Sequence, residues 1–523
     1  MPDATPRHPI VYVRGYAMSR GEIDSTTADP FCGFNLGSTV YRATPDKKQP
    51  PRKFIFESPV VRLGTDFGYQ DVFVDGVDIM DADWPQGRPI PMRSIVVYRY
   101  YDEASTLLGK GKTPEIETFA RGLGDLILKV RSLVLAHPEC TVTRDTFRVH
   151  LVAHSMGGLV CRAFLQNPAL GKPEARAAVD KFFTYATPHN GIELAGLNVP
   201  EWLSANDLNN FNRDRMREYL DLKAVAKQTG RVDWLPEDRF PIERVFCLVG
   251  TNRQDYEVAH GMSRTFAGHG SDGLVRIENA SVWGIDRAGA TTPCATAYTY
   301  RSHSGFFGIV NSEEGYQNLI RFLFGDVRID VVAEIDSVRL PRELKGKTVD
   351  ALYQFEVQAS PRGKRWMLTR RMAEEDSVAC LRHKDLAGPD AGGAAKEIYL
   401  STLFLANVAR VDPTRKSLAC ALYFAVRVPD YEVEKRFWPN GHFEGRYLYR
   451  ETFTVELEPP AKEGGRFRIG YAAQSENLAS SLGELDARRI QEGKTVLRIP
   501  FGRPATEPGL SGSLRLTVSG WNR

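Results

Sequence analysis

Residues 148–160 read Arg-Val-His-Leu-Val-Ala-His-Ser-Met-Gly-Gly-Leu-Val. The run before Ser155 is mostly apolar, which is typical of a buried strand. The sequence after Ser155 continues as Met-Gly-Gly-Leu-Val-Cys-Arg-Ala-Phe-Leu, which is typical of a helix. Because no spacer separates these parts, the stretch predicts a strand, a sharp turn at Ser155 and a helix, in that order.

The turn, Ala153-His154-Ser155-Met156-Gly157, is a variant of the G-x-S-x-G nucleophile elbow with alanine in place of the first glycine. Small residues are needed two positions before and after the serine, because the strand and helix backbones approach closely there. The serine then sits in a strained turn that exposes its hydroxyl group. Ser155 is therefore the candidate nucleophile, although serine with small neighbours also occurs in ordinary turns.

Strand and helix patterns alternate on both sides of this stretch. Apolar strands are expected at residues 9–13, 94–100, 181–185, 244–250 and 296–300, and helices at residues 114–137 and 312–324. Continuous apolar strands that alternate with helices are typical of a parallel sheet covered on both faces. We therefore expect a doubly wound, mostly parallel α/β domain over residues 1–325.

Two long segments interrupt this pattern. Residues 18–92 are rich in Gly, Asp and Pro, and we expect either a cover for a substrate pocket or an ordinary packed insertion. Residues 192–240 combine many charges with helix-permissive sequence, which suits a cap or lid. After residue 325, strand-like alternation recurs without interleaved helices, so residues 326–523 are expected to form an all-β, sandwich-like domain.

Two candidate partners for Ser155 follow it in the chain. A serine hydroxyl is a weak nucleophile and needs a general base, which is itself oriented by an acid. Asp272 lies in a Ser-Asp-Gly turn before an apolar run, and His303 directly follows the strand expected at 296–300. The order serine, acid, histidine is the one that this type of elbow uses.

Alternatives remain for each partner. Asp272 could serve only an Asx turn, and Asp255 is a rival acid because it lies closer to the end of the 244–250 strand. His260 and His269 precede Asp272 and are therefore out of order as the base.

Three further residues are candidates for substrate contact. Gly15 ends the first strand, where it either lets the chain turn back over the serine or simply ends a strand. His154 is the variable elbow residue, and its side chain is expected to point away from Ser155. His189 is expected to line the pocket or to brace its loop.

Composition limits the remaining classes. The 523 residues include 68 basic and 65 acidic ones, so the net charge of +3 identifies no partner and gives no sign of a nucleic-acid binder. The 7 cysteines are scattered singly and show no metal-ligand spacing, so we expect neither a metal nor a cofactor. The N-terminus lacks the apolar core of a secretory signal, and no run approaches the ~18 apolar residues of a membrane span. A cytoplasmic location is the default expectation, with export by a signal-independent route as the alternative.

Five segments together make the chain resemble the lipase-like branch of the α/β-hydrolase superfamily, including the inositol-deacylase-like proteins related to the factor that remodels GPI anchors. They are Pro-Ile-Val-Tyr-Val-Arg-Gly-Tyr at 9–16, His-Ser-Met-Gly-Gly at 154–158, Ala-Thr-Pro-His-Asn-Gly at 186–191, Asp-Gly-Leu-Val at 272–275, and His303. The resemblance covers residues 9–325. Two departures are Ala153, where many relatives have glycine, and Arg14, where histidine is common before the glycine.

The resemblance implies an α/β-hydrolase fold and acyl transfer from an ester to water. Ser155 would attack the ester carbonyl, His303 would take and return the proton, and Asp272 would orient the imidazole. The backbone amides of Met156 and Tyr16 would bind the oxyanion. A lipid or lipid-like ester is the implied substrate, and peripheral contact with a membrane would fit it. The alternatives are an acyltransferase or thioesterase that uses the same residues, and a catalytically idle scaffold that binds a membrane or protein.

Overall fold

The structure is a computed structural model that describes residues 7–15, 34, 39–43, 52–56, 58–73, 77–85, 87–100, 115–194, 197–198, 210–222, 230–254, 270–305, 308–387, 395–410, 414, 417–433, 441–460, 465, 467–475, 490–491, 494–503 and 506–522. The chain divides into two compact units. Unit 1 comprises residues 1–296 and 301–319, and unit 2 comprises residues 297–300 and 320–523.

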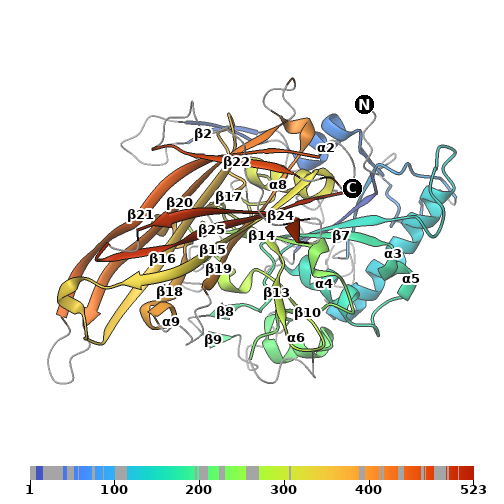
Figure 1. Cartoon of the computed structure of the whole chain (residues 1–523). Coiled ribbons are helices and arrows are strands. Elements are labelled where there is room, and N and C mark those ends of the chain that lie inside the picture. Colours follow the sequence, from blue (N-terminus) through green and yellow to red (C-terminus); the bar gives the residue numbers. More distant parts are fainter. Residues whose placement is uncertain are drawn as a thin grey trace. The chain divides into compact units, whose positions relative to one another are not determined.

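A seven-stranded sheet forms the centre of unit 1 (Figure 1), although residues 297–299 of its edge strand are assigned to unit 2. Its strands, in spatial order, are β14 (Ala295–Thr299), β11 (Val245–Gly250), β7 (Val179–Tyr185), β6 (Val149–His154), β1 (Ile10–Val13), β5 (Ser94–Val97) and β4 (Gln70–Asp71). The pairings from β11 through to β4 are parallel. The predicted mostly parallel α/β sheet is therefore confirmed.

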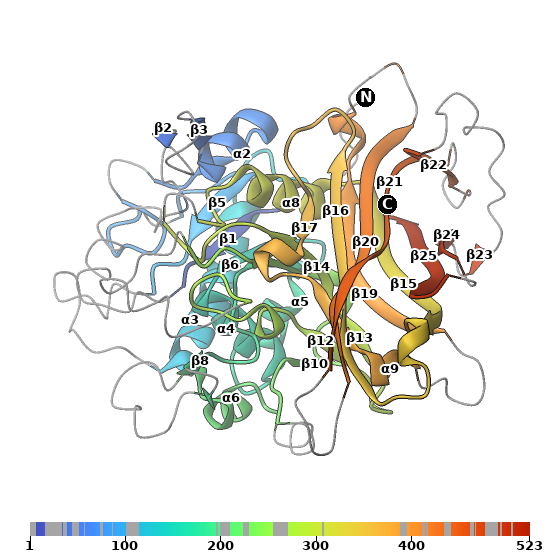
Figure 2. The ribbon, with the colours of Figure 1, turned by 90° about the vertical axis from the view of Figure 1, so that its left-hand side faces the viewer.

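The described α-helices of unit 1 are α2 (Pro59–Phe67), α3 (Ile116–Leu135), α4 (Met156–Gln166), α5 (Pro173–Ala177), α6 (Arg213–Tyr219) and α8 (Glu313–Phe324), the last of which begins in unit 1. Of these, α4 packs against β6 and β1 of the sheet. Figure 2 shows α3 and α4 side by side next to β1 and β6. Val11 and Val13 of β1 belong to the same apolar core as Leu123 of α3, whereas Tyr12, between them, stacks on Phe34 with ring centroids 4.1 Å apart. The strands are buried on both faces, which is why their sequences are apolar without alternation.

The two predicted insertions contain short elements. The described parts of residues 18–92 hold β2 (Thr39–Ala43), β3 (Arg52–Phe56), α2 and β4. In residues 192–240, the described residues form β8 (Glu193–Leu194), β9 (Leu197–Asn198), α6 and β10 (Trp234–Pro236). The strand β10 joins β12 (Trp283–Ile285) and β13 (Thr291–Pro293) in a small sheet, a pairing that the helix-permissive sequence did not indicate.

Unit 2 contains two sheets, and the strand pairs described in them are antiparallel. One sheet has the order β19 (Lys396–Leu405), β15 (Val327–Arg339), β25 (Gly509–Gly520), β24 (Lys494–Gly502) and β23 (Ile490–Gln491). The other has the order β17 (Thr369–Arg371), β16 (Val349–Pro361), β20 (Leu418–Val433), β21 (Gly441–Glu458) and β22 (Arg468–Ala473), with β18 (Ala379–Arg382) paired to β16.

Alternate residues of these long strands point into one apolar core that both sheets share. The predicted all-β character of the C-terminal region is confirmed. The sequence patterns did not indicate the short helix α9 (His383–Ala387) or the 3₁₀ turn η8 (Asn407–Ala409). Among the described residues, no helix is long and apolar enough to cross a membrane.

Candidate active site

Ser155 lies at the junction of β6 and α4, where the backbone turns sharply. Its φ is 52° and its ψ is −128°, a conformation that residues other than glycine seldom adopt and that costs on the order of 1–3 kcal/mol. The amide of Ser155 donates to the carbonyl oxygen of Tyr185 at 2.9 Å, which ties the turn to the end of β7. The surrounding structure therefore holds the serine in a strained position between strand and helix.

The close packing at this turn explains why the sequence needs small residues there. A Cβ atom on Gly157 would lie 2.0 Å from the carbonyl oxygen of Val13, so the start of α4 can approach β1 only with glycine at this position. A Cβ atom on Gly15 would lie 2.2 Å from the Cβ of Ser155. The end of β1 therefore lies directly against the serine.

His303 contacts the hydroxyl group of Ser155. Its Nε2 atom is 2.9 Å from Ser155 Oγ, and its ring is 3% exposed. Its backbone amide donates to the carbonyl oxygen of Asp272 at 3.0 Å, so main-chain and side-chain contacts join the same two residues. The histidine comes from the loop after β14, as the sequence order predicted.

Asp272 uses its two carboxylate oxygens differently. Its Oδ1 accepts the amides of Leu274 at 3.0 Å and Val275 at 2.7 Å, which is an Asx-type turn. Its Oδ2 lies 2.9 Å from Nδ1 of His303, and the carboxylate is 1% exposed. The carboxylate therefore makes the contacts of an Asx-type turn and a contact with His303 at the same time.

This arrangement can move a proton. A carboxylate only accepts, so Nδ1 of His303 donates to Asp272, which leaves Nε2 of a neutral imidazole as the acceptor for the Ser155 hydroxyl. Met156 is the first residue of α4, and the first amides of a helix have no partner within it. An oxygen that gains negative charge beside Ser155 could therefore be stabilised by this end of α4.

His154 lies beside His303. Its Nε2 is 2.8 Å from the backbone carbonyl oxygen of His303, and the ring centroids are 5.0 Å apart. Burial, and then the proximity of His303, lowers the pKa of His154 well below its ordinary value. No sequence signal pointed to this contact, because it joins residues far apart in the chain.

His189 is fully buried, with its Nε2 3.3 Å from the hydroxyl of Thr184. Its carbonyl oxygen accepts Nη1 of Arg162, a buried arginine of α4 that also donates to the carbonyl oxygens of Val232 and Trp234. These contacts brace the loop after β7, as one of the two sequence interpretations of His189 expected. A substrate contact by His154, His189 or Gly15 stays a prediction.

Other sequence candidates lie outside the described residues. They are Tyr16, the second expected oxyanion donor, the rival acid Asp255, and the two histidines His260 and His269. The structure thus brings together Ser155, Asp272, His303, Met156 and Gly15.

One family model matches the sequence, the PGAP1-like alpha/beta domain, over residues 118–266. The matched segment contains the turn at Ser155 and ends before Asp272 and His303. A search among curated proteins gave no match.

Solved structures similar to this chain include two of a phospholipase. Phospholipase PlaB from Legionella pneumophila in complex with thio-NAD is 14% identical, over 79% of this chain and 84% of that chain, with a TM-score of 0.30. A second structure, of phospholipase PlaB from Legionella pneumophila, is 12% identical. It matches over 79% of this chain and 85% of that chain, with a TM-score of 0.28.

Proposed function

We propose that unit 1, a lipase-like domain of the α/β-hydrolase superfamily, is a serine hydrolase that cleaves carboxylic esters through an acyl-enzyme. One observation carries the proposal: a single imidazole, that of His303, lies 2.9 Å from the hydroxyl of Ser155 and 2.9 Å from the carboxylate of Asp272. The positive φ of Ser155 adds support, because strain of this kind gathers at functional sites.

In the proposed reaction, Ser155 Oγ attacks the ester carbonyl carbon while its proton passes to Nε2 of His303. The Asp272 carboxylate stabilises the imidazolium that forms and keeps it oriented. The amide of Met156, together with the expected amide of Tyr16, would bind the oxyanion, and losing one such donor typically costs about 10²-fold or more in rate. His303 then protonates the departing alkoxide, and a water molecule activated by the same histidine releases the acid.

The ester is proposed to be that of a lipid or phospholipid. The support is the resemblance of residues 9–325 to the lipase-like branch, together with the match to the PGAP1-like domain family. The same serine could instead transfer its acyl group to an alcohol or accept it from a thioester, so the substrate class needs its own measurement.

The first experiment tests for a reactive serine. The full chain is treated with a fluorophosphonate probe, and we expect covalent labelling of the wild type that is absent in Ser155→Ala. Ser132→Ala, which removes an exposed hydroxyl from α3, is the matched control and should label like the wild type. A wild type that does not react with the probe would contradict the proposal.

The second experiment tests the substrate. Hydrolysis of p-nitrophenyl esters of increasing chain length is compared with release of fatty acid from phospholipid vesicles, with and without an added alcohol acceptor. Activity that rises with chain length and extends to vesicles supports a lipid substrate. Activity on acetate alone contradicts it, and faster transfer to the alcohol than to water would favour the acyltransferase.

A further inference from the structure

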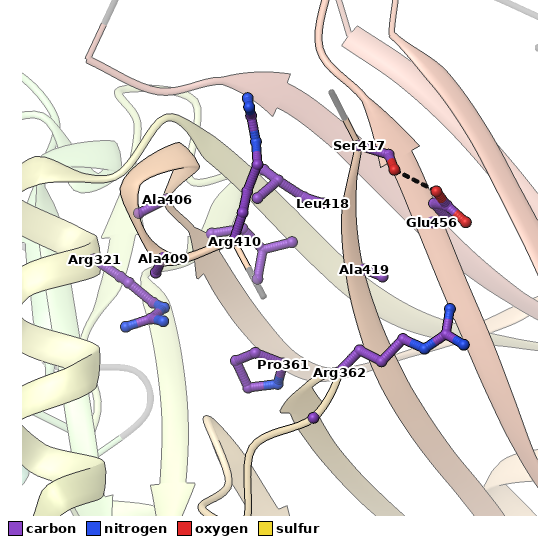
Figure 3. Close-up of a pocket in the computed structure, with 12 residues that line it drawn as sticks. Arg321, Pro361, Arg362, Ala406, Ala409, Arg410, Ser417, Leu418, Ala419 and Glu456 are labelled. Atoms are coloured by element: carbon purple, nitrogen blue, oxygen red, sulfur yellow. Dashed lines mark hydrogen bonds between the residues drawn. The ribbon is translucent and has the colours of Figure 1, made fainter. Parts of the chain in front are cut away.

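Unit 2 contains a pocket of about 320 Å³ (Figure 3). It lies where the end of β16, the end of β19 and the start of β20 come close to the turn η8. This volume is at the lower end of the ~300–1,000 Å³ typical of small-molecule sites. Much of its wall is apolar and buried, and Pro361, Leu405, Ala406 and Leu418 form it. A ligand that fits this wall has an apolar part.

The charged residues in the pocket are mostly basic. Among the described residues that line it, Arg321, Arg362 and Arg410 are cationic and Glu456 is acidic. Figure 3 shows the three arginines coming from three different segments: α8, the chain that leaves β16, and the chain that follows η8. Glu456 accepts the hydroxyl of Ser417, which occupies part of its hydrogen-bonding capacity. The excess of positive charge favours an anionic ligand, for which arginine provides a planar, multiple donor.

The segments that carry Arg362 and Arg410 are joined to neighbouring segments of unit 2 by hydrogen bonds. The amide of Arg362 donates to the carbonyl oxygen of Ala419 at 2.9 Å, which joins the end of β16 to the start of β20. Nη2 of Arg410 donates to Oδ1 of Asn407 at 2.6 Å, and the amide of Asn407 donates to a carboxylate oxygen of Asp326 at 2.6 Å. The backbone at Arg362 and the guanidinium of Arg410 are therefore held in place before any ligand arrives, which lowers part of the entropic cost of binding.

An exposed apolar residue adjoins the same wall. Val408 lies in η8 between the pocket residues Ala406 and Ala409, and its side chain is 74% exposed. On the other side of the pocket, the chain after β16 reads Arg362-Gly363-Lys364-Arg365, with Arg362, Lys364 and Arg365 exposed. An exposed apolar side chain on one side of a pocket and several cations on the other side form a combination that suits the surface of an anionic membrane.

We propose that this pocket binds the phosphate headgroup of an anionic phospholipid at a membrane surface, while Val408 contacts the acyl boundary. The three arginines point in different directions around the pocket (Figure 3), so they attract the phosphate through their combined positive charge, and the apolar wall takes the glycerol end of the lipid. A soluble phosphate compound would satisfy the arginines but would leave the apolar wall and Val408 without a partner, so the lipid is the better match. The inference does not depend on the reaction proposed for unit 1, because its test measures binding alone.

The test is co-sedimentation of the full chain, carrying Ser155→Ala so that lipids stay intact, with vesicles of phosphatidylcholine with or without phosphatidylglycerol. We expect binding only to the vesicles with phosphatidylglycerol. The double variant Arg362→Gln, Arg410→Gln should bind about 10- to 30-fold more weakly, because each cation near an anionic surface contributes to membrane affinity.

A matched control removes two charges from unit 2 away from the pocket. Lys384 of α9 follows β18, whose Arg382 pairs with Leu352 near the start of β16, and Lys396 is the first residue of β19. Both lie about 30 Å from the pocket along strands of this length. Lys384→Gln, Lys396→Gln should bind like the parent chain, and an equal loss in the two double variants would overturn the proposed site.

A further variant and a soluble ligand distinguish a lipid headgroup from a soluble phosphate compound as the occupant of the pocket. Val408→Ser should weaken vesicle binding at least about threefold and leave thermal unfolding unchanged, because the side chain is exposed. Calorimetric titration with glycerol phosphate should show no saturable binding in the millimolar range. Saturable binding of glycerol phosphate without binding to vesicles would assign the pocket to a soluble ligand, and absence of both would overturn the proposal.

Discussion

Nε2 of His154 donates a hydrogen bond to the backbone carbonyl oxygen of His303 at 2.8 Å, so a residue of the elbow supports the loop that carries the candidate base. Burial lowers the pKa of His154 well below its ordinary value, with a further contribution from His303. A neutral His154 matters because the ring centroids are 5.0 Å apart, and a second cation there would oppose the imidazolium that forms on His303. His154 thus acts as a positioning residue in the proposed mechanism.

Replacing His154 should lower the turnover rate without weakening substrate binding. His154→Phe keeps an aromatic ring but leaves the carbonyl oxygen of His303 without its donor, and we expect kcat to fall about tenfold at unchanged KM. His154→Gln, which keeps an amide donor, should recover part of the loss. Steady-state kinetics on a p-nitrophenyl ester measures both values, and equal kcat in the wild type and His154→Phe would remove the positioning role.

The acid can be identified by two matched variants. Asp272→Asn keeps the shape of the side chain but removes the charge that faces Nδ1 of His303, and we expect kcat to fall by about 10³–10⁴-fold. Asp255→Asn should change kcat less than threefold. Thermal unfolding serves as the control for Asp272→Asn, because Oδ1 also holds the turn at Leu274 and Val275. If Asp255→Asn alone abolishes activity, the rival assignment is correct.

Most of the fold could be predicted from local sequence patterns. The sheet strands of unit 1 are continuous apolar runs, and the strands of unit 2 alternate, so each type could be predicted from a few neighbouring residues. The helix α2 also has a local signal, since Ser58 accepts the amide of Val60 at 3.1 Å and Pro59 occupies the first turn. That signal lies within residues 18–92, for which the composition predicted only a pocket cover or a packed insertion.

Contacts between distant segments could not be predicted in the same way. The pairing of β10 with β12 and the contact of His154 with His303 both depend on how loops fold over the sheet edge. The side chain of His154 was expected to point away from Ser155, and that expectation did not include its contact with the backbone carbonyl oxygen of His303. Strand periodicity gives the face on which a side chain lies but not what packs there, so this expectation had no information about the His303 loop.

Arg162 connects α4 to the segment that contains β10, and its loss should destabilise unit 1. Its guanidinium is 1% exposed and donates to the carbonyl oxygens of His189, Val232 and Trp234 at 2.9 Å each. In Arg162→Met these three acceptors lose their donors in a buried site, so we expect the free energy of unfolding to fall by about 3 kcal/mol or more. Urea denaturation followed by fluorescence measures the change.

Arg162→Lys is the informative comparison, because it keeps the charge but cannot donate to three acceptors in a planar fork. It should recover less than half of the lost stability. Arg148→Met is the control, because the guanidinium of Arg148 donates only to the carbonyl oxygens of nearby residues, Asp145 and Phe147, among the contacts described. This variant should lower the free energy of unfolding by less than about 1 kcal/mol. A loss of similar size at both positions would mean that the cross-segment contacts of Arg162 contribute little.

Acid should destabilise unit 1 through a cluster of buried bases at the start of β6 and β7. His150 pairs with Lys181 across the two strands, and the rings of His8 and His150 have centroids 5.2 Å apart. Burial lowers the pKa of His150 well below 6.5, with Lys181, His8 and Arg7 adding to the effect. Burial likewise lowers the pKa of His8 from 6.5 to about 4 and that of Lys181 from 10.5 to about 7.

The sign of the pH dependence follows from these shifts, and His150→Gln tests it. Between pH 6.5 and about 4 the unfolded chain binds protons at His8 and His150 that the folded chain excludes, so the free energy of unfolding falls as the pH falls. Each such group contributes a slope of about 1.4 kcal/mol per pH unit within its window. Lys181 acts in a higher window, from pH 10.5 down to about 7, where stability also falls as the pH falls.

The experiment is urea denaturation of the wild type and of His150→Gln from pH 5 to pH 8, with the free energy of unfolding plotted against pH. The difference between the two curves should be constant above pH 7 and decrease below pH 6.5, because the variant lacks one of the excluded protons. Parallel curves over the whole range would mean that His150 takes up its proton at the same pH in the folded and the unfolded chain, and the lowering of its pKa by burial would then be wrong.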